Sequence, residues 1–213
     1  LNYACKSKEI WNVPCPIFIR GIAMEGSIGP VAGSSHHSIY YKMPGIKIVS
    51  PMTPKEYLIA YNDFMMNDDV MYVSEHRGSY SNTEELKDFN GDNFDLVLFP
   101  ISITRFEAQK AKKELEREGY KIGIANVLWI KPFLLKREWE ETVIKSKFGG
   151  IVLDDDYTQG VASSIAFELM KKTKKNFEVM GLKNKSAGFS KKTDNLPPSC
   201  EEIVLKCKNI INK

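Results

Sequence analysis

The chain has 213 residues, of which 43% are hydrophobic, so it is long enough and apolar enough for one large or two small packed domains. Its 30 basic and 27 acidic residues are interspersed and leave a formal net charge of only +3, which argues against a nucleic-acid-binding surface. Four cysteines without CxxC spacing indicate reduced thiols in a cytoplasmic protein, not a disulfide framework or a zinc site. No apolar run approaches 18 residues and no signal peptide is present, so we expect no membrane partner.

The first residues predict the end of a helix. Residues 1–11 have helical character, and Val13-Pro14 stops the helix because proline disfavours helical backbone at the residue before it. The chain begins with Leu1 in what reads as the middle of this helix. We therefore expect the sequence to be N-terminally incomplete.

A long loop with two histidines follows. Apolar runs at 17–19 and 46–49 predict parallel strands, and the loop between them carries the pair His36-His37. The same passage begins with a glycine-rich part that contains Gly21, Gly26, Gly29 and Gly33. Loops of this length in compact domains are usually functional, and open α/β sheets keep their ligand sites at the carboxyl ends of strands. The glycine spacing is not that of a dinucleotide-binding fingerprint.

Thr53-Pro54-Lys55-Glu56 predicts a helix start, with Thr as N-cap, Pro at the first helical position and Glu in the first turn. This helix is expected to reach Met66 and to be followed by a buried strand at 70–74. We interpret Glu75-His76-Arg77 as surface polar residues near a pocket. Residues 78–94 are rich in Gly, Ser, Asn and Asp and predict a linker.

The remaining residues predict alternating strands and helices. Strands are expected at 95–101, 121–128, 150–153 and 177–180, and helices at 104–118, 138–147 and 160–172 and after Ser199. Thr104 with Glu107, and Ser199 with Glu202, predict capping boxes, and Gly119 predicts a helix stop. Strands alternating with helices of this length indicate parallel βαβ units.

Three acidic residues, Asp154, Asp155 and Asp156, follow the third of these strands. They could form a metal or catalytic carboxylate cluster. A position ahead of a helix N-terminus explains them more simply, because carboxylates there interact favourably with the helix dipole.

Three ordered pieces of the sequence resemble one protein family. Residues 13–21 (VPCPIFIRG) match a V-P-x-V-x-R-G strand, residues 33–38 (GSSHHS) a histidine-serine segment, and residues 44–51 (PGIKIVSP) a P-G-L-K-V-V-x-P strand. These pieces resemble the β-subunit of thiamine-diphosphate-dependent 2-oxo acid dehydrogenases, in the transketolase-like superfamily. Residues 95–98, 128–132, 155–160 and 196–197 resemble later motifs of that family. Two positions depart from its pattern: Ile39 replaces glutamine, and Lys131 replaces arginine.

The resemblance implies an α/β fold in two domains. Residues 1–77 would form the later part of a pyrimidine-binding, transketolase-like domain, and residues 78–94 a linker. Residues 95–213 would form a transketolase C-terminal domain with a parallel or mixed sheet.

The resemblance also implies an activity shared between chains. The family decarboxylates 2-oxo acids oxidatively and passes the acyl group to a lipoyl group, with thiamine diphosphate and Mg²⁺ held between subunits. The implied partners are an α-subunit, a second β-subunit and a lipoyl-bearing acyltransferase. The family's cofactor-activating glutamate would lie upstream of Leu1, so we assign no cofactor-binding residue here and expect this chain alone to be inactive.

The resemblance implies catalytic roles for the two histidines. His37 would face the cofactor-bound intermediate, where it would position or protonate substrate or the incoming lipoyl group, and His36 would line the same entrance. An imidazole that titrates near neutrality suits such proton transfer. We expect the His37 ring to be little buried, because small residues flank it. Without the resemblance, a structural or solvent-exposed pair is the alternative, and a metal site is disfavoured because no third ligand lies at a recognisable spacing.

Two other functions remain open. One is the C-terminal part of a transketolase or a deoxyxylulose-phosphate-synthase-like enzyme. Those relatives show G-P-T-H-Q where this chain has Ser35-His36-His37-Ser38, which favours the dehydrogenase. The other is a non-catalytic module that dimerises and docks a partner. The sequence does not identify the 2-oxo acid.

Overall fold

The structure, a computed structural model, describes residues 1–25, 27–29 and 32–213, so Gly26 of the glycine-rich loop lies outside the described residues. It has the predicted α/β fold, with two sheets of four strands each. The elements of the first half are α1 (Asn2–Trp11), β1 (Ile17–Ala23), α2 (His37–Tyr41), β2 (Ile46–Val49), α3 (Pro54–Met66), β3 (Val70–His76) and the short 3₁₀ turn η1 (Arg77–Ser79). Those of the second half are β4 (Leu96–Pro100), α4 (Thr104–Arg117), β5 (Ile122–Ile124), β6 (Trp129–Lys131), α5 (Arg137–Lys145), β7 (Gly150–Tyr157), α6 (Val161–Thr173), β8 (Phe177–Leu182), the 3₁₀ turn η2 (Lys191–Thr193) and α7 (Cys200–Ile211).

The first sheet has the strand order β1-β3-β2-β6. β3 pairs in parallel with both β1 and β2, and its residues are buried throughout. Both faces of β3 are packed, Met71 and Val73 on one and Val70 and Tyr72 on the other, which explains its apolar run at 70–73. Helix α3 covers one face of this sheet through a small cluster that contains Ala60, Met71 and Val73.

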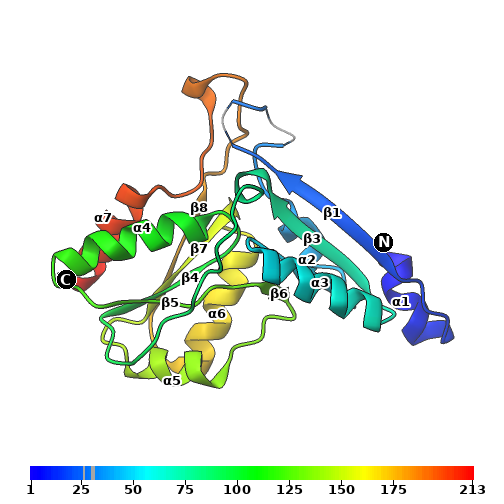
Figure 1. Cartoon of the computed structure of the whole chain (residues 1–213), viewed down its shortest axis with the longest axis horizontal. Coiled ribbons are helices and arrows are strands. Elements are labelled where there is room, and N and C mark those ends of the chain that lie inside the picture. Colours follow the sequence, from blue (N-terminus) through cyan, green and yellow to red (C-terminus); the bar gives the residue numbers. More distant parts are fainter. Residues whose placement is uncertain (26, 30–31) are drawn as a thin grey trace.

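The second sheet has the order β5-β4-β7-β8, and all its pairs are parallel. Figure 1 shows α4 and α7 on one side of it and α5 and α6 on the other. The first side is packed around Leu96, Leu98 and Leu115. The other side shares one continuous core with the first sheet, which contains Ile48, Tyr72, Phe99 and Ile165. The two halves of the chain are therefore joined through apolar packing.

The strand expected at 121–128 is shorter in the structure, and a separate, unpredicted strand follows it in the other sheet. β5 ends at Ile124, and β6, which begins at Trp129, pairs antiparallel with β2 in the first sheet. β6 covers an edge of β2 that would otherwise expose unpaired backbone groups. Lys131 then donates hydrogen bonds to the carbonyls of Tyr41 (2.6 Å) and Met43, at the end of α2.

Two of the three predicted side-chain caps are confirmed. The hydroxyl of Thr53 accepts from the backbone N–H of Glu56, and Ser199 forms a complete capping box with Glu202. The prediction at Thr104 is wrong, because Ile103 is the N-cap of α4. The Thr104 hydroxyl donates instead to the carbonyl of Ile101 (2.6 Å). It therefore stabilises the connection between β4 and α4 and does not cap the helix.

Residues 78–94 have little regular structure, yet side chains in this segment are packed against both halves. Phe89 and Phe94 belong to the shared core. Asp88 accepts hydrogen bonds from the backbone of Asn126 (2.9 Å) and the indole of Trp139 (3.2 Å). The domain boundary proposed at this segment stays a prediction. None of the described helices has the length and apolarity that crossing a bilayer requires.

Candidate functional site

A part-buried ion pair joins β1 to the carboxyl end of β3. Arg20 donates to both carboxylate oxygens of Glu75, at 2.6 and 2.8 Å, and Tyr80 donates to the same carboxylate at 2.6 Å. The bond to Glu75 and its negative charge raise the pKa of Arg20. Our interpretation of Glu75 and His76 as surface residues is therefore wrong: both are buried, and only Arg77 of the three is exposed. Glu75 is buried because the planar arginine fork satisfies it.

A cleft of about 740 Å³ opens beside these strand ends. It is lined by Glu25 after β1, by His76 and Arg77 at the end of β3, and by the first turns of α4 and the residues before α7. Glu107 and Lys110 on α4 form an ion pair across 2.6 Å in its wall. Apolar surface comes from Met24, Ile103, Phe106 and Leu196. A mainly apolar cleft with a few charged groups at the carboxyl ends of strands is a typical ligand site.

His76 and Glu25 face each other in this cleft. The Nδ1 atom of His76 accepts from the backbone N–H of Gly78 (3.1 Å), so the ring proton lies on Nε2, 3.7 Å from a Glu25 carboxylate oxygen. Burial lowers the pKa of His76 to about 4, because a charged imidazole loses its hydration there. Burial also raises the pKa of Glu25, and the nearby carboxylate of Glu107 adds to the effect. Glu25 was not predicted as a site residue, because the strand expected from the sequence ends at residue 19, whereas β1 extends to Ala23, two positions before Glu25.

The two adjacent histidines do not share a site. His36 is half-buried and lines a second cavity of about 790 Å³, together with Ser38, Tyr41, Asp156 and Tyr157. At its floor, Ser38 accepts a hydrogen bond from the backbone of Val161 (3.0 Å), at the start of α6. A side chain at Gly160 would overlap Ser38, which explains the glycine. The catalytic roles assigned to His36 and His37 stay predictions.

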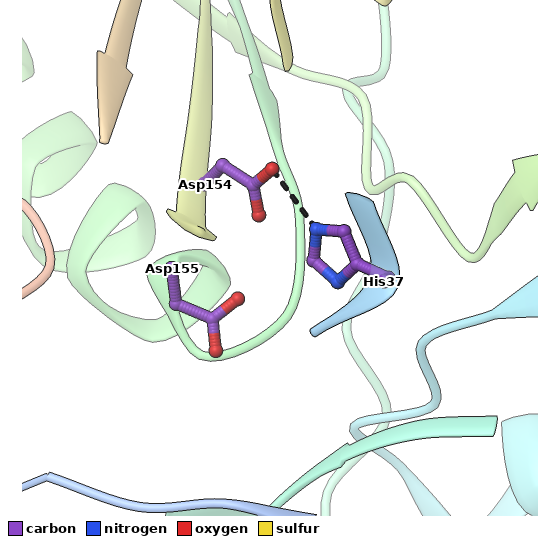
Figure 2. A group of neighbouring side chains, drawn as sticks. All are labelled: His37, Asp154 and Asp155. Carbon is purple, nitrogen blue, oxygen red and sulfur yellow. Dashed lines mark hydrogen bonds and ion pairs between the residues drawn. The ribbon is translucent and has the colours of Figure 1, made fainter. Parts of the chain in front are cut away.

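The expectation that His37 is little buried is wrong, because its exposed fraction is 0%. It is the first residue of α2, and its ring turns into the interface between the two sheets (Figure 2). Nε2 lies 3.1 Å from Oδ2 of Asp154 on β7, and Nδ1 lies 3.0 Å from the Ser74 hydroxyl on β3. Burial by itself lowers the pKa of His37, but the charge and hydrogen bond of Asp154 outweigh it and raise the pKa to about 9.

Ser74, His37 and Asp154 have the contact order of a nucleophilic triad. The three side chains are all buried, and none of them lines a described cavity. A triad needs its serine to reach a substrate carbonyl beside oxyanion donors. Hydrolytic chemistry therefore does not follow from this geometry.

The explanation of residues 154–156 by a helix dipole is also wrong. All three aspartates lie inside β7 and are buried. Asp155 accepts from the hydroxyls of Ser35 (2.7 Å) and Ser102 (2.8 Å), and Asp156 accepts from the backbone of Ser38 (3.1 Å). Burial, followed by the charge of Asp154, raises the pKa of Asp155 to about 7. The cluster thus connects β7 to the loop that precedes α2.

No protein-family model matches this sequence, and no curated protein is detectably similar to it. Solved structures do share its fold. A split-gene transketolase described as an inactive beta4 tetramer superposes with a TM-score of 0.67 and 14% identity, over 92% of this chain and 66% of that chain. A transketolase from Campylobacter jejuni subsp. jejuni NCTC 11168 superposes with a TM-score of 0.62 and 14% identity, over 92% of this chain and 31% of that chain.

These likenesses define the class of fold: the chain has a transketolase-like α/β fold. It spans about two thirds of the first of these chains and about a third of the second. At this identity the similarity extends to the fold, and function must be argued from the site.

Proposed function

We propose that this chain is one part of a thiamine-diphosphate-dependent enzyme of the transketolase-like superfamily, assembled from more than one polypeptide. The cleft beside Glu25, His76 and Arg77 carries this proposal, because it places proton-handling and cationic groups at the carboxyl ends of β1 and β3. The match over 92% of the chain to a split-gene transketolase supports it. The cofactor is inferred from the similarity of the fold, and the acid–base and charge interactions are inferred from the residues of the cleft.

The charges of the cleft suit an anionic substrate. Arg77 is exposed, and its guanidinium contacts the sulfur of Met24 at 3.4 Å. In the described part of the chain Arg77 forms no ion pair, whereas Lys110 is neutralised by Glu107. A carboxylate or phosphate would therefore gain a charge-assisted bond from Arg77. Both 2-oxo acids and sugar phosphates carry such a group.

Glu25 and His76 can hold and move a proton beside that substrate. Glu25 has a raised pKa, and His76 stays neutral and offers an Nε2–H donor. A carboxyl group with a raised pKa is suited to general acid–base work near neutral pH. In this proposal the pair lies next to the reacting atoms, and His36 lines a separate entrance.

The residues of the cleft fit one wall of a cofactor site. Its apolar surface and the donor of His76 suit an aromatic ring. They do not fit the magnesium–diphosphate end, which requires several hard oxygen ligands around one ion, because Glu107 is already paired with Lys110. We assign that end to a partner polypeptide. Bound thiamine diphosphate would supply the carbanion chemistry that the side chains of this chain lack.

Two reactions are candidates for this site, and each has its own support. Oxidative decarboxylation of a 2-oxo acid, with acyl transfer to a lipoyl group, is favoured by the His36-His37-Ser38 segment and its resemblance to dehydrogenase β-subunits. Ketol transfer between sugar phosphates is favoured by the two transketolase neighbours. We place the dehydrogenase first because the resemblance covers several motifs along the chain.

Co-expression with the candidate diphosphate-binding polypeptide tests the proposal. The purified pair is assayed with thiamine diphosphate and Mg²⁺ for 2-oxo-acid-dependent reduction of an artificial electron acceptor, and separately for ketol transfer. Arg77→Ala should raise KM by about tenfold, since one charge-assisted bond contributes about 1.5 kcal/mol. Arg137→Ala is the matched control, because that exposed arginine pairs with Glu141 on α5. A stable pair without either activity would contradict the proposal.

A further inference from the structure

The buried cluster of His37, Asp154 and Asp155 contains more negative charge than its protein partners neutralise. Together with Asp156 it places three carboxylates against one imidazole. In the described part of the chain, no lysine or arginine forms an ion pair with any of the three aspartates. Burying an uncompensated carboxylate costs several kcal/mol, so such a cluster needs protons or a cation.

Two carboxylate oxygens in this cluster lack a hydrogen-bond partner. They are Oδ1 of Asp154 and Oδ1 of Asp155, on side chains that are nearly or fully buried. The other oxygens are engaged: Oδ2 of Asp154 by His37, and Oδ2 of Asp155 by two serine hydroxyls. Buried polar atoms are nearly always satisfied, so two orphan oxygens in one place indicate a missing ligand.

The geometry of the cluster is that of a set of metal ligands. One atom from each of His37, Asp154 and Asp155 lies within 4.8 Å of the other two, and Figure 2 shows the carboxylates next to the imidazole. Ligands on one ion with bonds of about 2.1 Å lie about 3 Å apart, and His37 Nε2 is 3.1 Å from Asp154 Oδ2. We propose that His37, Asp154 and Asp155 bind one divalent transition-metal ion between the two sheets.

The second layer of contacts supports this assignment. If Nε2 binds the metal, the ring proton lies on Nδ1 and is donated to the hydroxyl of Ser74. Asp155 is oriented by Ser35 and Ser102. Metal-binding histidines nearly always donate their other N–H in this way, and ligating carboxylates are themselves hydrogen-bonded. The imidazole favours Zn²⁺ and similar ions over Mg²⁺ or Ca²⁺, which prefer oxygen ligands.

The ion would have a structural role. It is separate from the cleft of the proposed function, and no described cavity gives access to it. His37 precedes the first sheet's β2, whereas both aspartates lie on β7 of the second sheet. A metal at this point would fasten the two halves together. A metal at the histidine pair was disfavoured because no third ligand lies at a recognisable spacing, and the two aspartates are more than a hundred positions away.

The test is the metal content and Zn²⁺ affinity of the full chain. We expect about one equivalent of metal after purification without chelator, and a Co²⁺ derivative with absorption bands of a nitrogen- and oxygen-ligated ion. Removing the metal with EDTA should lower the melting temperature. Nitrogen NMR of His37 should show the proton on Nδ1 when metal is bound.

Three variants make the test specific. Asp155→Asn keeps the size and the serine contacts, and His37→Gln removes the nitrogen ligand; each should weaken Zn²⁺ binding by about 100-fold or more. His76→Asn removes a buried histidine outside the cluster and should leave binding unchanged, with circular dichroism confirming that each variant is folded. A metal-free wild-type chain, with equal weak Zn²⁺ affinity in all four proteins, would show that the cluster holds protons only and would overturn the proposal.

Discussion

At the residue scale, two neighbouring histidines have opposite environments. His37 is enclosed between the sheets and touches Ser74 and Asp154, whereas His36 borders a cavity. The backbone explains the divergence: His36 is the N-cap of α2, and His37 is its first helical residue. Adjacent residues at a helix start point in different directions, so one contributes to the core and the other faces a cavity.

We predict that His37→Ala lowers the free energy of unfolding by about 3–5 kcal/mol, because it leaves the buried Asp154 carboxylate without its partner. This follows from the full burial of His37, where the small flanking residues had led us to expect a ring that is little buried. His36→Ala is the matched control and should cost less than about 1 kcal/mol. Urea denaturation of both variants measures the difference. Equal, small losses would show that the His37 contact contributes little.

The buried His76 predicts a dependence of stability on pH. Its folded-state pKa of about 4 lies below the ordinary value of 6.5, so the unfolded chain binds the proton more readily. The contribution of neutral His76 to the free energy of unfolding is fully present above pH 6.5, and it is lost as the pH decreases toward 4. Between pH 7 and pH 5 this residue should account for a loss of about 2 kcal/mol.

His76→Asn should remove this loss, because the amide oxygen can still accept from Gly78 but does not titrate near neutrality. Glu25 faces His76 and has a raised pKa, so the comparison is repeated in the Glu25→Gln background. Denaturation curves at pH 7 and pH 5 provide the measurement. The same slope with and without His76 would contradict the assignment of a neutral imidazole.

At the scale of elements, helix ends show where local sequence decides the structure. The capping box of α7 is complete, with Ser199 accepting from Glu202 at 3.2 Å and Glu202 accepting from Ser199 at 3.0 Å. We predict that Ser199→Ala costs about 1 kcal/mol of stability, and that Ser199→Asp retains most of it. Thermal melts of the two variants distinguish them. An unchanged melting temperature in Ser199→Ala would show that the end of α7 adds nothing to global stability.

The helix caps and the short strand β6 show which elements could be predicted from the sequence. The caps at Thr53 and Ser199 depend on residues within one helical turn, so the sequence alone is sufficient. Thr104 has the same local signature, but its hydroxyl bonds to Ile101 because the preceding connection is tight. β6 has only three residues, and its partner β2 is about 80 positions away, so no local periodicity could reveal it. Element types were predictable, whereas long-range pairing was not.

In the candidate sites too, local features could be predicted from the sequence and long-range contacts could not. The position of the cleft after β1 and β3 follows from the rule for parallel strands. His76 and Arg77 line it, whereas Glu75 does not. Burial of Glu75 could not be predicted, because it depends on Arg20, 55 positions earlier. The bond between His37 and Asp154 joins residues 117 positions apart. Neither composition nor local spacing in the sequence predicts contacts between residues this far apart.

At the scale of the whole molecule, charged groups fasten the two halves in addition to the shared core. Arg105 on α4 is fully buried, and its guanidinium contacts Glu56 at the start of α3 at 2.7 Å and also the carbonyl of Val127. A planar guanidinium makes both contacts with a fixed fork of donors, which the ammonium group of a lysine lacks.

We predict that Arg105→Met destabilises the chain by about 3 kcal/mol or more, and that Arg105→Lys recovers only part of the loss. Glu56→Gln in the Arg105→Met background should restore stability, because it removes a carboxylate charge that keeps the bond from the Met52 N–H but has lost its ion-pair partner. Urea denaturation followed by fluorescence and by circular dichroism measures each variant. If the double variant is no more stable than Arg105→Met, the Glu56 pair is not the source of the loss.

The central claim is that this chain supplies one wall of a thiamine-diphosphate site and a partner supplies the other. Calorimetric titration with thiamine diphosphate and Mg²⁺ tests it most directly, first on this chain and then on the chain with its diphosphate-binding partner. We predict no saturable binding to the chain alone and saturable, magnesium-dependent binding to the complex. Micromolar binding to the chain alone, or none to a well-formed complex, would contradict the claim.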